Sequence, residues 1–146
     1  MSVLLTISQT TEKLNKFQTL IKVLHLSGFY ETFDRFGKFT MFAPTDQAFG
    51  QIPARIMENL PKPENVTALR ALVGYHTVRG TLQAKQLADK KSVANIVGST
   101  LRFAFDEDSF RVNNALVIES DIKALNGCVH IIDRVLLPLG KSEKMS

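Results

Sequence analysis

The sequence has a single cysteine and no tryptophan among its 146 residues. One thiol, Cys128, cannot form a disulfide within the chain, so we expect the fold to be stabilised by packing alone. A zinc site built on paired cysteines is excluded for the same reason. Because the neighbours of Cys128 are apolar and β-branched, the thiol is expected to be buried and unreactive rather than nucleophilic.

Long apolar runs are also absent. No stretch approaches the roughly 20 apolar residues that span a bilayer, so no membrane span is expected. The start of the chain lacks the basic segment and the continuous apolar stretch of a signal peptide. The sequence is therefore expected to be either an intracellular product or a secreted domain supplied without its leader.

Charge of one sign is nowhere concentrated. The formal net charge is +4, but Lys and Arg are spread along the chain with acidic residues between them. A nucleic-acid-binding surface would gather its basic residues on one face, usually with stacking aromatics, so no nucleic-acid partner is expected. The acidic run at residues 106–108 lacks the further ligands and the glycine of a calcium loop, and we expect a solvated hairpin tip there.

Catalytic and metal-binding patterns are missing as well. The sequence has no Gly-x-Ser-x-Gly elbow, no phosphate-binding glycine loop and no dinucleotide fingerprint. Its three histidines, His25, His76 and His130, are far apart and do not show the spacing of metal ligands. We therefore predict a protein that is not an enzyme and that has no catalytic residue, metal or cofactor.

The sequence does contain enough apolar residues for one sizeable core. It is 45% hydrophobic, and its ten Phe residues need no hydrogen-bond partner when they are buried. The length matches that of one domain. We predict an N-terminal extension at residues 1–9, one domain at residues 10–139 and a polar tail at residues 140–146.

Helical patterns predominate in the first half of the chain and strand patterns in the second. Thr10 or Thr11, followed by apolar residues at helical spacing, predicts one helix that ends at Gly28. Further helices are expected at residues 29–36, 66–73 and 81–87 and after Pro53. Strands are expected at residues 39–43, 75–78, 93–97, 101–105, 110–112, 116–118 and 128–137. This segregation predicts an α+β fold rather than an alternating βαβ array.

Three stretches of the sequence together resemble the fasciclin domain family. The first, FTMFAPTDQAF at residues 39–49, is similar to the first motif of the family. The second is the tyrosine-histidine pair Tyr75 and His76. The third, NGCVHIIDRVLLP at residues 126–138, is similar to the second motif, and the order and spacing of the three stretches also fit.

This resemblance implies a wedge-like β-sandwich of two short sheets with helices packed around one side. We expect the following motif residues to have structural roles: Thr45, Asp46, Asn126, Gly127 and His130. Thr45 and Asp46 are placed to cap a helix, and His130 is expected to be neutral, with a hydrogen-bond partner at residues 45–46. The two motifs are expected to be neighbours, with Phe42 and Ile131 in one core.

Members of the family commonly act in adhesion, matrix assembly or cell-surface contact, usually outside the cell, and have no general catalytic role. The resemblance therefore implies a binding module whose partners are cell-surface or matrix proteins, and we expect the protein to be a monomer. Asp121 and Ile122 match the aspartate-isoleucine pair of receptor-binding members. Ser120 and Lys123 depart from the best-known adhesive form, which has proline and methionine at these positions.

Several alternatives stay open. Tyr75 and His76 are candidates for partner contact, but a core pair that holds a strand in register explains them as well. A groove between the two motifs is a candidate site for a small apolar ligand such as a carotenoid, although core packing explains its residues equally well. The expected lining of this groove is Phe42, Ala43, Phe49, Val129 and Ile131. Asn65 fits the glycosylation pattern, which matters only on a eukaryotic secretory route.

Overall fold

A computed structural model describes residues 4–60, 62–107 and 109–136. The predicted tail at residues 140–146 and the end of the predicted strand at Leu137 lie outside them. The helices are α1 (Ile7–Leu14), α2 (Gln18–Ser27), α3 (Phe29–Arg35), α4 (Asp46–Phe49), α5 (Ala54–Asn59), the 3-10 helix η1 (Pro63–Asn65), α6 (Val66–Tyr75) and α7 (Ala84–Lys90). The strands are β1 (Phe39–Pro44), β2 (Thr77–Arg79), β3 (Ser92–Ala94), β4 (Thr100–Phe105), β5 (Phe110–Val112), β6 (Ala115–Ala124) and β7 (Gly127–Ile132).

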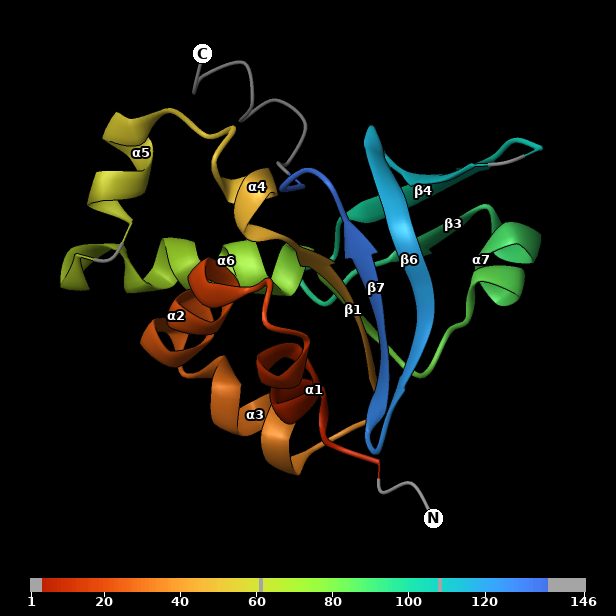
Figure 1. The fold of residues 1–146 in the computed structure, drawn as a ribbon, viewed down its shortest axis with the longest axis horizontal. Coiled ribbons are helices and arrows are strands. Elements are labelled where there is room, and N and C mark those ends of the chain that lie inside the picture. Colours follow the sequence, from red (N-terminus) through yellow and green to blue (C-terminus); the bar gives the residue numbers. More distant parts are fainter. Residues whose placement is uncertain (1–3, 61, 108, 137–146) are drawn as a thin grey trace.

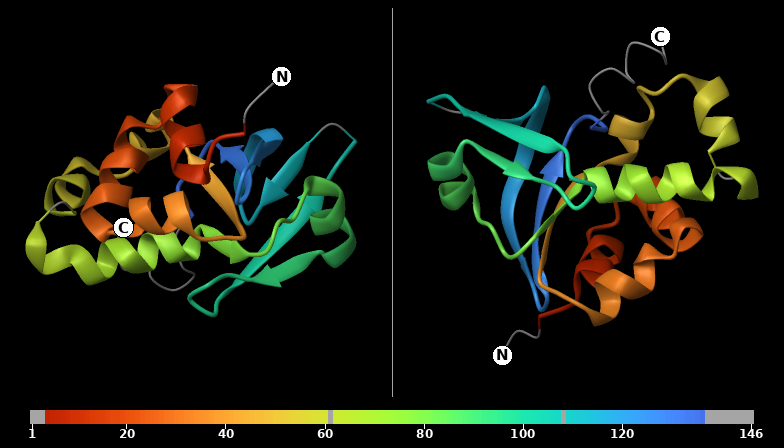
Figure 2. Two further views of the ribbon diagram at one scale, coloured as in Figure 1. Left: turned by 90° about the horizontal axis from the view of Figure 1, so that it is seen from below. Right: turned by 180° about the vertical axis from the view of Figure 1, so that it is seen from behind.

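The strands follow one another in space in the order β2-β1-β7-β6-β5-β4-β3. Neighbouring strands are antiparallel except β1 and β7, which run parallel although they lie at opposite ends of the sequence. The long, curved strand β6 connects the layer that contains β1 and β7 to the layer that contains β4 and β5 (Figure 1). The two layers splay apart as a wedge (Figure 2). The fold is α+β, which confirms the prediction.

Helices α1, α2, α3 and α6 gather on one face of the β1–β7 pair (Figure 1). Burial of an apolar face provides most of the stability of such short helices. The buried members of this helical core are Ile7, Phe17, Leu20, Val23, Leu24, Phe33, Met41, Ala43, Ala48, Phe49, Leu69, Val73, Ala124, Val129, Ile131 and Val135. Helix α7 is separate from this group and lies against β3 and β4.

The opposite face of β1 and β7 packs against β4 and β5. This sandwich core contains close aromatic contacts, because the ring of Phe42 lies 5.7 Å from that of Phe103 and 5.3 Å from the imidazole of His130, measured between centroids. Its buried hydrophobic members are Phe42, Tyr75, Val78, Leu87, Leu101, Phe103, Phe110, Val112, Ala115, Ile132 and Leu136. The β1–β7 pair is therefore covered on both faces.

The expectation that Phe42 and Ile131 share one core is wrong. The two motifs are neighbours, as predicted, since β1 and β7 pair along their whole length. In that register Phe42 lies opposite His130, and Ala43 lies opposite Ile131. Successive residues of a strand point to opposite faces, so Phe42 enters the sandwich core and Ile131 the helical core.

The single helix predicted from Thr10 to Gly28 is in fact two helices. Thr6 caps α1, because its Oγ1 accepts the N–H of Gln9 at 3.2 Å. Thr10 and Thr11 lie inside α1 and do not cap it. Asn15 ends α1 in a left-handed conformation with φ of 57°, and α2 begins three residues later. Because the apolar residues keep their helical spacing across this break, periodicity did not reveal it.

Other predicted boundaries also change. Gly28 ends α2 with φ of 82°, as predicted. Tyr75 is the last residue of α6 rather than part of a strand, and β2 begins at Thr77. Strand β7 ends at Ile132. The predicted domain boundary at residue 10 falls inside α1, whose Ile7 is fully buried in the helical core.

Candidate functional site

The middle of β6 is exposed, whereas the first and last residues of this strand are buried. Glu119 pairs with Ile131 and Ile122 with Val129, so β6 has one more residue than β7 between these pairs. An extra residue of this kind bends a strand and re-aims its side chains. We call this stretch the β6 bulge, which consists of Glu119, Ser120, Asp121 and Ile122.

The backbone of the β6 bulge changes direction at Asp121. Its backbone is left-handed, with φ of 62°, a conformation that aspartate tolerates better than most residues. Its carboxylate Oδ1 accepts the N–H of Ala84, the first residue of α7, at 2.8 Å. Within the described residues Oδ2 accepts no hydrogen bond, and the side chain is 41% exposed. The carboxylate is thus held in place and still accessible.

His130 binds the backbone of the β6 bulge from the interior of the protein. Its side chain is fully buried, its Nδ1 accepts the backbone N–H of Asp121 at 3.1 Å, and its Nε2 donates to the carbonyl of Leu82 at 2.8 Å. This pattern requires the neutral tautomer with the proton on Nε2. Burial lowers the pKa of His130 below its ordinary value, which favours the same state. Both observations agree with the predicted neutral histidine, but its partners are Asp121 and Leu82 rather than residues 45–46.

Cys128, His130 and Asp121 lie in the order of a nucleophile, a base and an orienting acid, but their hydrogen bonds run the wrong way for that chemistry. The thiol lies 3.6 Å from Nε2 of His130 and donates to the carbonyl of Leu82 at 3.2 Å. Because Nε2 already carries the proton, it cannot accept one from the thiol. Burial raises the pKa of the Cys128 thiol, so the thiol is an inert member of the interior.

Tyr75 and His76 lie in the interior, away from the β6 bulge, and are only 3% and 4% exposed. Nε2 of His76 accepts the N–H of Leu136 at 2.7 Å, and Nδ1 pairs with the carbonyl of Leu72 at 2.7 Å. This ring therefore fastens the segment after β7 to the end of α6. Burial lowers the pKa of His76 to about 4, so it is neutral at neutral pH. The pair fills the structural role that the sequence left as an alternative.

Comparison with known proteins identifies the family. The family model described as "Fasciclin domain" matches residues 15–138. The chain belongs to the fasciclin family. The predicted resemblance is confirmed.

Individual fasciclin-domain proteins extend this match. Protein sll1483 from Synechocystis sp. is 38% identical over 122 residues, which cover 84% of this chain and 67% of that protein. Periostin from Homo sapiens is 36% identical over 114 residues, which cover 77% of this chain but 13% of periostin. The solved FAS1 domain pair from the insect cell adhesion molecule fasciclin I has a TM-score of 0.84 at 18% identity, covering 97% of this chain and 52% of that one. This chain therefore spans about half of the solved pair.

The first fasciclin motif caps two helices. Thr45 accepts the N–H of Ala48 at 3.2 Å and caps α4, as predicted. The carboxylate of Asp46 instead accepts the N–H groups of Gln18 and Thr19, at 3.2 Å and 2.8 Å. These are the first residues of α2, which has no cap of its own. Asp46 thus stabilises a helix that lies far from it in the sequence.

The second fasciclin motif begins with two residues that position the strands. The Asn126 side chain accepts the N–H of Ile7 at 2.9 Å and donates to the carbonyls of Phe33 and Phe36. Gly127 lies so close to β1 that a Cβ atom would be 1.7 Å from the carbonyl oxygen of Phe39. Only glycine permits this approach.

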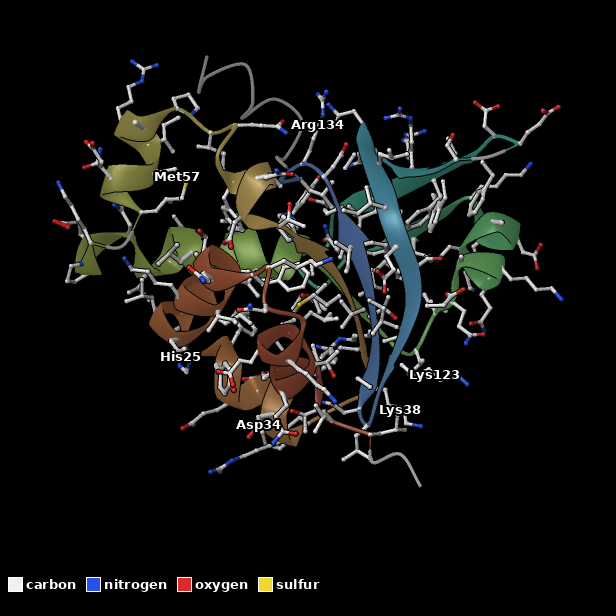
Figure 3. All side chains as sticks on the ribbon, viewed as in Figure 1. His25, Asp34, Lys38, Met57, Lys123 and Arg134 are labelled. Atoms are coloured by element: carbon white, nitrogen blue, oxygen red, sulfur yellow. The ribbon has the colours of Figure 1, made fainter. Side chains whose placement is uncertain are left out.

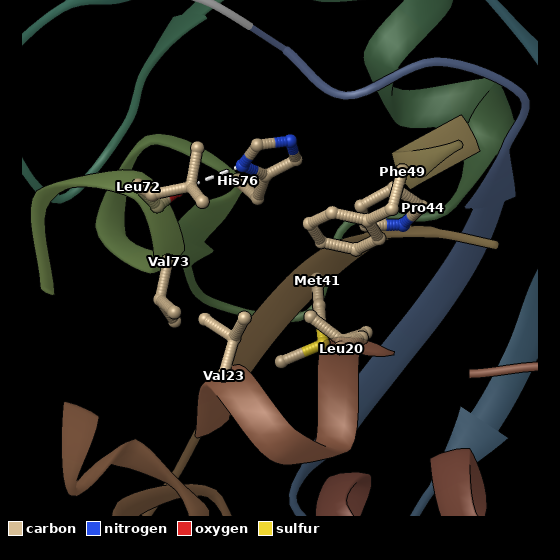
Figure 4. A pocket seen from close by; sticks show the side chains of 8 residues that line it. All are labelled: Leu20, Val23, Met41, Pro44, Phe49, Leu72, Val73 and His76. Atoms are coloured by element: carbon tan, nitrogen blue, oxygen red, sulfur yellow. Dashed lines mark hydrogen bonds between the residues drawn. The ribbon is translucent and has the colours of Figure 1, made fainter. Parts of the chain in front are cut away.

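The predicted apolar groove is filled by the protein itself. All five predicted lining residues are at most 3% exposed: Phe42, Ala43, Phe49, Val129 and Ile131. A small pocket does lie beside Phe49, between α2, α6 and β1 (Figure 4). It has about 10 Å³ of space for the centre of a water molecule, room for about one water. A carotenoid-sized ligand would require repacking of the core, and the carrier role stays a prediction.

The sequence did not reveal that Leu82 accepts hydrogen bonds from the side chains that lie under the β6 bulge. Leu82 accepts from both His130 and Cys128, and the N–H of Leu82 donates to Oγ1 of Thr40 at 2.8 Å. The only sequence signal for this contact was Thr40, a threonine among the inward-facing residues of the first motif.

Among the described residues no three His, Cys, Asp or Glu side chains are close enough to share a metal ion. Nor does any described helix combine the length and hydropathy needed to cross a bilayer.

Proposed function

We propose that this fasciclin domain is a non-enzymatic binding module whose β6 bulge contacts a cell-surface or matrix protein. The observation that carries the proposal is the state of Asp121, whose carboxylate is held by Ala84 and remains 41% exposed. A charged group that is fixed before binding loses little conformational freedom when a partner arrives.

The neighbouring side chain complements this carboxylate. Ile122 is half-buried and packs against the helical core, so its apolar surface is also held in one place. Together the two residues present a charge beside an apolar contact, which is the mixture found in specific protein interfaces. The left-handed backbone at Asp121 turns the carboxylate away from the regular path of β6.

Two relatives support a role in protein contact. The solved domain pair comes from the insect cell adhesion molecule fasciclin I, and periostin carries a region similar to this chain. By this analogy we place the domain outside the cell or at its surface, and we propose separately that it acts as a monomer. The hydrogen bonds of Cys128 and His130, which run the wrong way for nucleophilic catalysis, support the non-enzymatic part of this proposal.

The test compares partner capture by the wild type and two variants. Asp121→Asn keeps an oxygen for the N–H of Ala84 and removes the charge, and Ile122→Ala removes the apolar contact. The matched controls are Asp89→Asn, which alters an exposed carboxylate on α7, and Val97→Ala, which alters an exposed aliphatic side chain. We expect each bulge variant to retain about one tenth or less of the captured cell-surface or matrix protein, and the controls to retain all of it. Equal capture by all five proteins would refute the proposed site.

A further inference from the structure

Three segments meet at one end of the molecule, where β6 turns into β7 beside the start of β1 (Figure 1). The N–H of Leu125 donates to the carbonyl of Leu5 at 2.7 Å, and the side chain of Asn126 donates to the carbonyl of Phe36. The N–H of Phe39 donates in turn to the carbonyl of Asn126 at 3.0 Å. We call this end the tip, and it includes Leu4, Arg35, Phe36, Lys38, Lys123 and Leu125.

The tip exposes three large apolar side chains. Phe36 and Leu125 are each 62% exposed, the highest values among the large hydrophobic residues of the described chain, and Leu4 is 48% exposed. They come from three different segments, so no single helix or strand face accounts for them. Hydrophobic residues that gather in this way mark contact surfaces, whereas single exposed ones do not.

The charges of the tip are predominantly positive. Arg35 and Lys38 flank Phe36, and Lys123 precedes Leu125 by two residues; all three cations are exposed. Lys38 and Lys123 lie at the same end of the molecule (Figure 3). The nearest acid in sequence, Asp34, is half-buried, and its carboxylate accepts the hydroxyl of Thr6 at 2.8 Å. Phe36 and Leu125 therefore have exposed lysine and arginine as close sequence neighbours, and the exposed carboxylate that lies two residues before Lys123, Asp121, belongs to the β6 bulge.

We propose that the tip docks on an anionic lipid surface. Apolar side chains that project from turns enter the boundary between headgroups and acyl chains, while neighbouring cations meet the anionic headgroups. A bilayer accepts such projecting groups without a matching pocket, whereas a protein partner would have to supply one. The tip is distinct from the β6 bulge, although the two surfaces adjoin where Ile122 precedes Lys123 on β6.

The experiment is sedimentation of the protein with vesicles of phosphatidylcholine alone and of phosphatidylcholine with one-third phosphatidylserine. We expect at least about tenfold more binding to the mixed vesicles, and weaker binding as salt rises. Phe36→Ser/Leu125→Ser and Lys38→Glu/Lys123→Glu should each reduce this binding about tenfold or more. The matched control is Phe105→Ser/Ile118→Ser, which removes two exposed hydrophobics from β4 and β6 and should bind like the wild type.

Three outcomes would overturn the proposal. They are equal binding by the wild type and both tip variants, equal binding to the two vesicle compositions, and binding to soluble polyglutamate but to neither vesicle. Circular dichroism and thermal unfolding of each variant separate lost binding from lost folding. Asp121→Asn should bind vesicles normally, and Phe36→Ser/Leu125→Ser, which leaves the neighbours of the β6 bulge unchanged, should capture protein partners normally, so failure of either proposal leaves the other testable.

Discussion

The β6–β7 hairpin has a turn end and a bulge end, and the two are held in different ways. At the turn, the side chain of Asn126 binds two other segments, the start of α1 and the end of α3, and Gly127 approaches β1 too closely for any side chain. At the bulge, Asp121 makes one backbone and one side-chain hydrogen bond, and its carboxylate remains accessible. The residues that make the family recognisable are therefore those that build the fold, whereas the proposed contact surface includes Ser120, one of the two positions at which the chain departs from the best-known adhesive form.

The strongest test of the turn end is Gly127→Ala. A Cβ atom 1.7 Å from the carbonyl oxygen of Phe39 would force β1 and β7 apart, so we expect a loss of at least about 4 kcal/mol in the free energy of unfolding. Urea denaturation measures this loss. Gly98→Ala is the matched control, because Gly98 also has a positive φ, of 88°, but has no heavy atom within 4 Å of the added carbon. It should cost about 1–2 kcal/mol. Equal losses would remove the steric distinction on which the comparison depends.

Asn126→Ala tests the same end through hydrogen bonding. The substitution leaves the N–H of Ile7 and two carbonyls without their partner, which should destabilise the fold by about 2–4 kcal/mol. Asn59→Ala, which removes one exposed hydrogen bond to the carbonyl of Arg55, should change stability by less than about 0.5 kcal/mol. Similar urea midpoints for the two variants would show that Asn126 does not hold the segments together.

Acid provides an intermediate test, because buried histidines lie beneath the bulge and beside α6. The folded-state pKa of His76 is lowered to about 4, whereas the unfolded chain takes up this proton near the ordinary value of 6.5. The unfolded state therefore binds more protons between these values, and stability present above pH 6.5 is lost as the pH falls toward 4. From pH 7 to pH 5 His76 alone should account for about 2 kcal/mol.

Unfolding at both pH values would measure this effect. His76→Gln keeps a side chain able to accept the N–H of Leu136 but cannot titrate, so it should lose about 2 kcal/mol less than the wild type over this interval. His130 contributes in the same direction, since burial also lowers its pKa. Because protonated His130 cannot accept the N–H of Asp121, the NMR signal of that amide should shift in acid before that of Ile7. Coincident shifts would argue that the bulge and the turn respond as one unit.

The smallest effect on stability is expected at Asp121 itself. Asp121→Asn retains an acceptor for Ala84, and asparagine also tolerates a left-handed backbone, so stability should change by less than about 0.5 kcal/mol. Thermal unfolding beside the partner-capture measurement checks both halves of the claim. A loss above about 1 kcal/mol would mean that the charge of Asp121 contributes to the fold as well as to the proposed contact.

Short-range signals in the sequence predicted much of the fold correctly. The strand at residues 39–43 is β1, the hydroxyl of Thr45 caps α4, and Gly28 ends α2. Each signal acts within a few residues of itself, through backbone sterics or a local hydrogen bond, so its meaning does not depend on distant parts of the chain. The apolar spacing from Leu14 to Leu24 was misleading, because Asp46 starts a second helix inside that pattern from a distant position.

The sequence alone determined the α+β class, the main elements and the family, because periodicity, caps and motifs are local properties of the chain. Only the tertiary structure decided which face each motif residue occupies, which groups pair with His130, and which apolar residues are exposed. These features depend on the register between β1 and β7, whose paired residues Phe42 and His130 are far apart in sequence. A shift of β7 by one residue would turn its helical-core side chains toward the sandwich core and its sandwich-core side chains toward the helical core.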